Sequence, residues 1–495
     1  MTLSRRHFLA TSAAGTAVMG LGFGLPSSFA ATPGASDMPD WHLGYTSAPA
    51  AGFEPSSMRL VYGKVPAGLE GTLYRNGPAH FLYGSDDYAS HWFDGDGMVQ
   101  RIAIADGKAV HSGRFVETVK HRIEQAEQKF SAPGFGTAGD LSFPVTGPDD
   151  VNAANTSVTV IDGELYALWE AGSAIAMDAK TLETKGPKAW RGDLAGMPFL
   201  AHPKREPDGT VWNLAINGPM VGVYQIGAGG GLNSFGLLDI GKAAYIHDWA
   251  MTERHLIIMV QPWINEALRP PVVDGFEWRP EEGFKFLIVD KDDFSNRRWA
   301  QGPARAFYHT GAAWEESDGT IRLDAALYKE PVLGVGGGVD EIRGVWKGTD
   351  ESFTSNLTQI VIPPSGDARL IETGLDGDFP QVDPRRHGLP RRLTALVTGQ
   401  SASHPGMTAV SVHDWSNGKT ESFEFGEGRM VEEFLFVAKP GSEAEEDSWL
   451  IGPVLNLKTG TTDICVFDAG HVSDGPVCIW RGDRSWPLGF HGTWS

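Results

Sequence analysis

Four of the 15 histidines have neighbours typical of a buried metal ligand. His202, His247, His309 and His491 each follow an apolar or aromatic residue and precede a turn-like or small one. A strand that ends at such a residue delivers its imidazole into a cavity, and imidazole is the commonest metal ligand in proteins. The four lie far apart in the chain and form no H-E-x-x-H helix motif, so only the fold could assemble them. Singly, a histidine is more often a surface or satisfied core residue.

The two cysteines exclude a thiolate-based metal site. Cys465 and Cys478 are the only ones in the chain, whereas structural zinc and iron–sulfur sites use three or four thiolates. Each lies in a strand-like apolar run, and a turn near His471-Val472 would place them opposite each other as a disulfide. Two buried, reduced thiols are an equally good interpretation.

The charge balance argues against nucleic acid as a partner. The formal net charge is −21, with 62 acidic and 41 basic residues in 495. Binding to phosphates requires Lys and Arg to neutralise them. With 41% hydrophobic residues the chain has enough apolar side chains for a large core, so disorder is not expected.

The N-terminus resembles a twin-arginine (Tat) export signal. Ser4-Arg5-Arg6 precedes a short stretch of apolar and small residues, and Ser28-Phe29-Ala30 provides an A-x-A-like cleavage site. We therefore expect residues 1–30 to engage the Tat export machinery and be removed, giving a periplasmic or otherwise exported protein. A membrane anchor is the alternative, but the run is short and rich in glycine. Residues 31–495 are expected to form a single domain.

The elements that must position the histidines are predicted to be strands. Apolar runs such as Ser157–Ile161 and His255–Val260 alternate with Asp-Gly and Asn-Gly turns. Helical segments are scarce, with Thr118–Gln128 and Val431–Phe436 the best candidates. Many short strands over some 450 residues predict an all-β fold, and a β-propeller suits this length because it leaves few free sheet edges. A pair of β-sandwiches or a β-helix are the alternatives.

A series of short strings running nearly end to end resembles the carotenoid cleavage oxygenases, a family of non-haem iron enzymes. The resemblance covers about residues 45–495 and rests on Gly71-Thr72-Leu73-Tyr74-Arg75-Asn76-Gly77-Pro78, His91-Trp92-Phe93-Asp94-Gly95-Asp96-Gly97-Met98, Asn155-Thr156, Ala167-Leu168-Trp169-Glu170, Ala201-His202-Pro203-Lys204, His247-Asp248, Thr252-Glu253, Asp383-Pro384-Arg385-Arg386 and Gly489-Phe490-His491-Gly492 with Trp494.

The resemblance implies a specific fold and metal site. The fold would be a seven-bladed β-propeller with iron on its axis and long loops forming a dome over the metal face. Fe²⁺ would be bound by His202, His247, His309 and His491. Carboxylates that do not touch the metal would accept hydrogen bonds from the second ring nitrogen of the histidines and offset the metal's charge. The implied pairs are Glu170 with His247, Asp378 with His309, and Glu433 with His491.

One of these carboxylates departs from the family pattern. The family usually has Glu-Phe-Pro where this chain has Asp378-Phe379-Pro380. Aspartate is one methylene shorter, so its reach to His309 requires a backbone shift or a bridging water. On this basis we expect Asp378→Glu to be tolerated or beneficial.

The implied activity is a dioxygenase reaction, classed as an oxidoreductase acting on single donors with incorporation of O₂. An apolar substrate and O₂ would meet at the metal, and a carbon–carbon double bond of a carotenoid or apocarotenoid would give two carbonyl products. Stilbene-cleaving relatives typically carry Lys immediately before the carboxylate equivalent to Glu170, where this chain has Trp169. Trp169 therefore favours a polyene substrate, with lignin-derived stilbenes as the alternative. A different class of function is a non-catalytic metal-binding propeller.

Other motif residues are interpreted as structural. His91 is expected to stabilise a hairpin turn and Arg75 to donate structural hydrogen bonds. The family contains members that dip into membranes, and Phe135, Phe143 and Trp263-Ile264 are the candidates here for such transient contact. Ordinary loop and core positions are the preferred interpretation of these aromatics.

Overall fold

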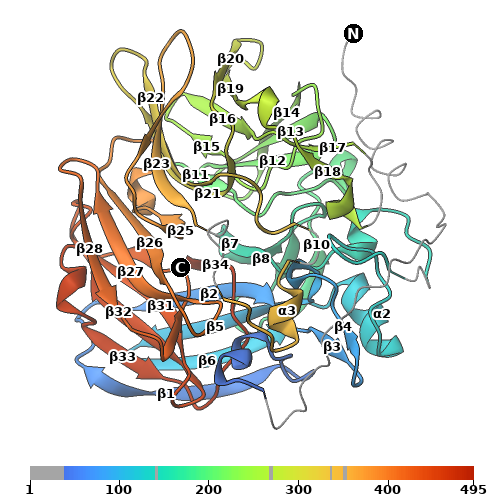
Figure 1. Cartoon of the computed structure of the whole chain (residues 1–495), viewed down its shortest axis with the longest axis vertical. Coiled ribbons are helices and arrows are strands. Elements are labelled where there is room, and N and C mark those ends of the chain that lie inside the picture. The colour runs from blue at the N-terminus through green and yellow to red at the C-terminus, as the bar shows by residue number, and fades with distance from the viewer. Residues whose placement is uncertain (1–37, 140–142, 267–270, 335–336, 349–353) are drawn as a thin grey trace.

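The computed structural model of the chain describes residues 38–139, 143–266, 271–334, 337–348 and 354–495. Strands dominate it, and the predicted all-β class is confirmed. The sheets lie around a central region in which β7 and β34 are found (Figure 1). The predicted signal peptide, residues 1–30, falls outside the described residues.

Four of the sheets are antiparallel and contain four strands each, in the order of the chain. They are β7 (Ser157–Ile161), β8 (Glu164–Leu168), β9 (Ile175–Met177) and β10 (Thr184–Pro187); β11 (Lys204–Arg205), β12 (Val211–Asn217), β13 (Met220–Ile226) and β14 (Leu232–Asp239); β15 (Ala250–Met251), β16 (His255–Val260), β19 (Phe284–Asp290) and β20 (Arg297–Gly302); and β21 (Ala306–Glu315), β22 (Ile321–Tyr328), β23 (Asn356–Ile362) and β24 (Arg369–Glu372).

A fourteen-stranded sheet joins the two ends of the described chain. It contains β25 (Gly377–Gln381), β26 (Leu393–Gln400), β27 (Met407–Asp414), β28 (Lys419–Glu424), β29 (Arg429–Val431), β30 (Leu435–Ala438), β31 (Ser448–Asn456), β32 (Thr461–Asp468), β33 (Cys478–Arg481), β1 (Phe53–Gly63), β6 (Lys108–Phe115), β5 (Gly97–Ala105), β2 (Gly71–Pro78) and β34 (His491–Trp494). Among the described strands, therefore, only four blades are separate four-stranded sheets, and seven separate blades are not seen.

Short elements complete the fold. Two-stranded ribbons are β3 (Leu82–Tyr83) with β4 (Asp87–Tyr88) and β17 (Trp263–Asn265) with β18 (Phe276–Trp278). The α-helices are α2 (Val119–Glu127) and α3 (Val339–Ile342), and the 3₁₀ turns are η1 (Asp40–Tyr45), η2 (Trp92–Asp94), η3 (Pro148–Val151), η4 (Gly192–Leu194), η5 (Val272–Gly275), η6 (Pro280–Glu282), η8 (Pro384–Arg386) and η9 (Val472–Asp474). None of the described helices has the length and apolar character needed to cross a membrane.

The core lies between neighbouring sheets. Leu214 and Val223 of one sheet pack in the same buried cluster as Ile258 and Leu287 of the next. Further clusters of this kind join other neighbouring sheets. Packing sheet against sheet fixes the position of each innermost strand, and these strands carry or flank the histidines.

Of the two predicted helices, one is confirmed and one is wrong. The segment Thr118–Gln128 forms α2, whose first turn is capped by the Thr118 hydroxyl accepting from the His121 amide at 3.1 Å. The segment Val431–Phe436 instead contains the end of β29 and the start of β30. All six residues of this segment are buried, including Glu432 and Glu433, so its polar and apolar positions give no periodicity that separates strand from helix.

Of the two interpretations of the cysteines, the structure supports the buried, reduced thiols. Strands β32 and β33 are neighbours as expected, but Cys465 pairs with Ile479 and Val466 pairs with Cys478. A one-residue offset sends the two side chains to opposite faces of the sheet. They accordingly lie in different core clusters as buried free thiols.

Candidate metal centre

The structure brings the four predicted histidines together. His202 and His247 lie just before the innermost strands β11 and β15, His309 lies within β21, and His491 begins β34. Their candidate ligand nitrogens all fall within 4.8 Å of one another. Each imidazole thus comes from a strand, or from the segment just before a strand, of a different sheet.

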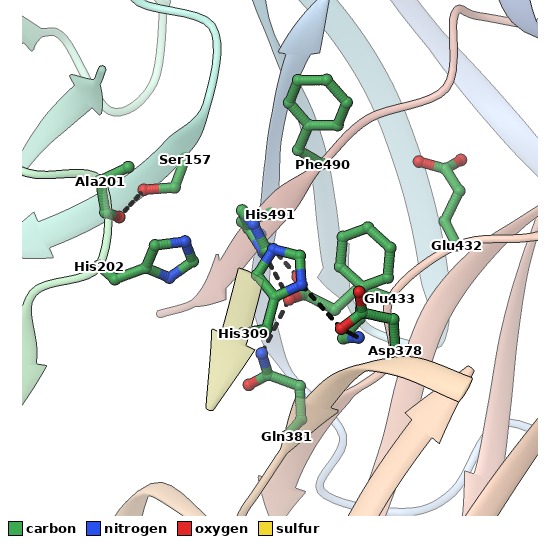
Figure 2. Close-up of polar contacts among 12 residues, drawn as sticks. Ser157, Ala201, His202, His309, Asp378, Gln381, Glu432, Glu433, Phe490 and His491 are labelled. Carbon is green, nitrogen blue, oxygen red and sulfur yellow. Dashed lines mark hydrogen bonds and ion pairs between the residues drawn. The ribbon is translucent and has the colours of Figure 1, made fainter. Parts of the chain in front are cut away.

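The ring nitrogens of these histidines face a common centre. The Nε2 atom of His247 lies 3.0 Å from Nε2 of His202 and 3.3 Å from Nε2 of His309. The ring centroid of His491 is 4.5 Å from that of His202 and 4.7 Å from that of His309. Figure 2 shows the ring of His202 facing those of His309 and His491.

Three of the rings are held from behind by carboxylates, in the expected pairs. The Nδ1–H groups donate to Glu170 from His247 at 2.6 Å, to Asp378 from His309 at 2.8 Å, and to Glu433 from His491 at 2.9 Å. Such bonds fix the tautomer, so that Nε2 presents its lone pair to the centre. His202 has no carboxylate partner among the described residues.

Asp378 reaches His309 directly in spite of its shorter side chain. Its second oxygen, Oδ2, accepts a hydrogen bond from the Tyr328 hydroxyl at 2.7 Å. The next residue, Phe379, adopts φ = +56°, a left-handed conformation uncommon outside glycine. The strand pairing shifts register between Asp378 and Gln381. The backbone therefore adjusts locally, and no bridging water is needed to explain the contact.

Glu433 is held by several donors. Arg75 donates to its Oε2 atom at 2.5 Å, the Gly492 amide donates to the same oxygen at 2.9 Å, and Gln381 donates to Oε1 at 2.8 Å. Arg75 also donates to the Phe490 carbonyl at 3.1 Å. The structural role expected for Arg75 is thus observed, and it acts on the carboxylate behind His491. Tyr328 and Gln381 were not anticipated, because no local motif marks either residue.

Burial governs the protonation of the cluster. Desolvation, together with the neighbouring histidines, lowers the pKa of His202, and desolvation lowers the pKa of His491 to about 4. Burial also opposes charge on His309, but attraction to Asp378 outweighs it and raises the pKa of His309. Burial likewise works against the charged forms of Asp378 and Glu433, yet their histidine partners hold both pKa values below the ordinary range.

The arrangement suits a bound cation. With Nδ1–H bonded to carboxylates, the facing Nε2 atoms of His247 and His309 are both lone-pair donors, and at 3.3 Å they would repel each other. Nitrogen ligands about 2.1 Å from one ion lie about 3 Å apart when they occupy adjacent positions. The observed spacing therefore fits imidazoles that share a metal ion.

The histidines open onto a cavity of about 580 Å³. Its wall includes His247, His309 and His491, whereas His202 lies outside the lining. A continuous series of ring contacts with centroid separations of 4.7–6.0 Å follows the wall through Tyr45, Trp92, Phe490, Phe93, Phe135 and Tyr245. The Tyr245 ring in turn lies parallel to His247 at 6.2 Å. Such a surface fits a flat, apolar ligand.

Trp169, the predicted substrate-pocket residue, also lines this cavity. Among the described residues no Lys or Arg lines it. The described wall therefore offers no cation to a phenolate.

The remaining candidates are structural. His91 is buried, accepts from the Phe93 amide at 3.0 Å and bonds the Gly334 carbonyl at 3.1 Å, which makes it the cap of η2 rather than part of a hairpin. Of the candidates for membrane contact, Trp263 and Ile264 are 5% and 4% exposed in β17, so they provide no surface patch. Phe135 lines the cavity and Phe143 is half-buried.

Comparison with known proteins agrees with this geometry. A family model described as retinal pigment epithelial membrane protein matches residues 48–495. Apocarotenoid-15,15'-oxygenase from Synechocystis sp. is 27% identical over 491 residues, covering 92% of this chain and 96% of that protein. Lignostilbene-alpha,beta-dioxygenase isozyme III from Sphingomonas paucimobilis is 27% identical over 482 residues, covering 88% and 93%.

A solved structure shares the fold. Cobalt-substituted apocarotenoid oxygenase from Synechocystis matches with a TM-score of 0.81 at 24% identity, covering 92% of this chain and 98% of that one. The family model spans nearly the whole described chain. The chain therefore belongs to the family of retinal pigment epithelial membrane protein and the carotenoid cleavage oxygenases.

Proposed function

We propose that this protein is an Fe²⁺-dependent dioxygenase that cleaves a carbon–carbon double bond of a carotenoid or apocarotenoid into two carbonyl products. The observation that carries the proposal is a four-imidazole cluster at the wall of a cavity lined by aromatic rings. The reaction balances without another reductant, because both atoms of O₂ enter the two new carbonyl groups.

Iron would be held by His202, His247, His309 and His491. When bound, it supplies the activation of O₂ that the alkene alone does not provide. Glu170, Asp378 and Glu433 keep three of the rings oriented and offset the positive charge. With only four protein ligands, the bound metal would remain accessible to small molecules.

The protein's own residues position the substrate and exclude water. The ring series from Tyr45 to Tyr245 sandwiches a planar polyene and limits its rotation, so that one double bond remains beside the histidines. No side-chain nucleophile or proton donor is required. The apolar wall also keeps water from the reacting atoms.

The substrate class is argued from Trp169. An indole at this position offers apolar contact to a polyene and cannot ionise a phenol. Stilbene cleavage by the same site remains the second candidate, since a lignostilbene dioxygenase is among the similar proteins. Incubating iron-loaded protein with an apocarotenal and a 4-hydroxystilbene, with mass spectrometry of the products, tests the choice. Aldehydes from the stilbene alone would overturn it.

The metal assignment has its own test. We expect protein purified without oxygen to contain about one iron per chain, and His247→Ala to lose iron and activity while keeping its thermal transition. Stoichiometric calcium without iron would instead support a non-catalytic binding module, although calcium prefers oxygen ligands and all four donors here are imidazoles.

We further propose a seven-bladed propeller arrangement for residues 31–495 as a single domain. Four blades would be the four-stranded sheets, and the fourteen-stranded sheet would comprise the other three. A family likeness to propeller proteins with iron on the axis supports this division.

Export through the Tat machinery to the periplasm is proposed from Ser4-Arg5-Arg6 and the site at Ser28-Phe29-Ala30. Fractionation of cells expressing the full chain, compared with an Arg5→Lys/Arg6→Lys variant, tests it. Retention of both in the cytoplasm would contradict export. Transient membrane contact is proposed from the family resemblance alone. Flotation of the exported protein with lipid vesicles would test it.

A further inference from the structure

One carboxyl group in the cavity wall has no part in the metal centre. Five acidic side chains line the cavity, and four are paired: Glu170, Asp378 and Glu433 with histidines, and Glu432 with Arg75 at 3.3 Å. Within the described part of the chain, the fifth, Glu341 of α3, has no ion pair and no hydrogen bond to another residue; its carboxylate accepts only from its own backbone amide. This half-buried carboxylate lines the cavity and keeps acceptor capacity free, so a donor group of a ligand can bind it.

Tyr45 belongs to the same part of the wall, because Ile342, the neighbour of Glu341, packs in one apolar cluster with it. The hydroxyl of Tyr45, a residue only 4% exposed, has no hydrogen-bond partner among the described residues. Burial and then the negative charge of Glu341 raise the pKa of Tyr45, and burial raises the pKa of Glu341. Tyr45 and Trp346 belong to one apolar cluster with Met430 and Leu488. The two polar groups thus lie in a largely apolar part of the cavity wall, where the Trp346 indole N–H is also buried without a hydrogen-bond partner in the described part of the chain.

This end connects directly to the metal centre along one wall. Phe490, next to His491, packs on Trp92 with ring centroids 4.7 Å apart, and Trp92 packs on Tyr45 at 5.4 Å. All three rings line the cavity. A rod-like ligand with a double bond at the histidines would therefore extend over these rings and end at Tyr45 and Glu341.

We propose that Glu341 and Tyr45 form a subsite that hydrogen-bonds a hydroxyl group at the end of the conjugated substrate. A hydroxyl can donate to the Glu341 carboxylate and accept from the Tyr45 phenol at the same time. A carboxylate end group would be repelled by Glu341. The proposal rests on the proposed function for the identity of the substrate, and it adds which end group the site selects.

The test measures binding in metal-free protein, so that it does not depend on turnover. Quenching of tryptophan fluorescence is titrated with a hydroxyl-ended apocarotenoid and with its otherwise identical deoxy analogue. Wild-type protein is expected to bind the hydroxylated ligand about 5- to 10-fold more tightly, which corresponds to the net contribution of one or two hydrogen bonds. Glu341→Leu and Tyr45→Phe should each reduce this preference, while leaving affinity for the deoxy analogue unchanged or improved.

Two further variants keep the test decisive. If Glu341→Leu fails to fold, Glu341→Gln keeps the side-chain shape and should still lower the preference in part, because a neutral amide oxygen accepts more weakly than a carboxylate. Met430→Leu alters the same wall without touching a polar group. Met430→Leu should retain the preference. Absence of any preference in the wild type, or equal losses for both ligands, would overturn the subsite. If both polyenes bind with the expected preference but iron-loaded protein cleaves neither, the proposed function fails and the subsite stands.

Discussion

The hydroxyl of Tyr328 donates at 2.7 Å to Oδ2 of Asp378, the carboxylate whose other oxygen holds His309. Tyr328 lies at the end of β22 and Asp378 in β25, so the contact joins two sheets across the wall of the cavity. It provides a second anchor for a carboxylate that is a methylene shorter than the family's usual glutamate. Tyr328 is therefore a positioning residue for His309.

Removing the Tyr328 hydroxyl should weaken metal binding. We expect Tyr328→Phe to lower affinity for Co²⁺ by about 10-fold, because outer partners of metal ligands are typically worth that much. Titration of metal-free protein while the visible absorption of Co²⁺ is recorded gives the affinity. The control is Tyr74→Phe, which removes a hydroxyl bonded to the Ala179 carbonyl outside the site. Equal Co²⁺ affinity in both variants would exclude the positioning role.

Asp378→Glu is now expected to impair the site, contrary to the expectation from family comparison. Both oxygens of Asp378 already lie at hydrogen-bond distance from their partners, so an added methylene must displace His309 or Tyr328. We expect iron content to fall, whereas Asp367→Glu on the surface should leave it unchanged. The double variant Asp378→Glu/Tyr328→Phe should recover part of the iron, because loss of the Tyr328 hydroxyl makes room for the longer side chain. Full iron content in the single variant would contradict this account.

Arg75 should be important for stability as well as for the site. It bonds both Glu432 and Glu433, and all three side chains are almost completely buried. Arg75→Leu would leave two buried carboxylates without their cation, which costs about 3–5 kcal/mol in comparable cases. Urea unfolding of the metal-free protein measures this loss. Arg75→Lys should recover part of it, and a loss below about 1 kcal/mol for Arg75→Leu would show that the buried charges are compensated elsewhere.

Acid should destabilise the fold through His111. This residue is 1% exposed, donates to Gln100 at 2.9 Å and stacks on Trp486 with centroids 4.1 Å apart. Burial, aided by the positive charge of Arg484, lowers the pKa of His111 to about 3. The His111 side chain takes up a proton near pH 6.5 in the unfolded chain but only near pH 3 in the folded chain. Above pH 6.5 this group therefore leaves the free energy of unfolding unchanged. Between pH 6.5 and 3 it lowers the free energy of unfolding by about 1.4 kcal/mol for each pH unit of acidification.

The measurement is urea unfolding at pH 7, 6 and 5. Below pH 6.5 the free energy of unfolding of His111→Gln should decline less steeply with acidification than that of the wild type. The two slopes should differ by the contribution of about one proton. Replacing the exposed His471 by Gln should leave the wild-type slope. An unchanged slope in His111→Gln would show that His111 is already charged in the folded state.

The candidate metal-binding histidines could be predicted from the sequence, whereas the residues that hold their carboxylate partners could not. The convergence of His202 and His491 came from likeness to a family, because their distance along the chain carries no geometric information. Tyr328 and Gln381 reach their carboxylates only through strand register, and tyrosine or glutamine in a strand looks the same whatever it faces.

The fold shows the same division. Alternating apolar runs and tight turns predicted the strands well, since side chains in a strand have a strict period of two. Register is less secure: an offset of one residue between β32 and β33 separates Cys465 from Cys478. The helix predicted over Val431–Phe436 failed for a different reason. Its two glutamates are buried like its apolar residues, so polarity does not mark a solvent face that would reveal the period.

The pairing of β2 with β34 has a consequence for the order of assembly. Asn76 and His491 are partners in this ladder although almost the whole domain separates them in sequence. Translation proceeds at about 5–20 residues per second, so β2 leaves the ribosome well before its neighbour exists. A nascent chain can bring together at most three of the imidazoles. Tight metal capture should therefore be a late, post-synthetic event that marks a finished fold.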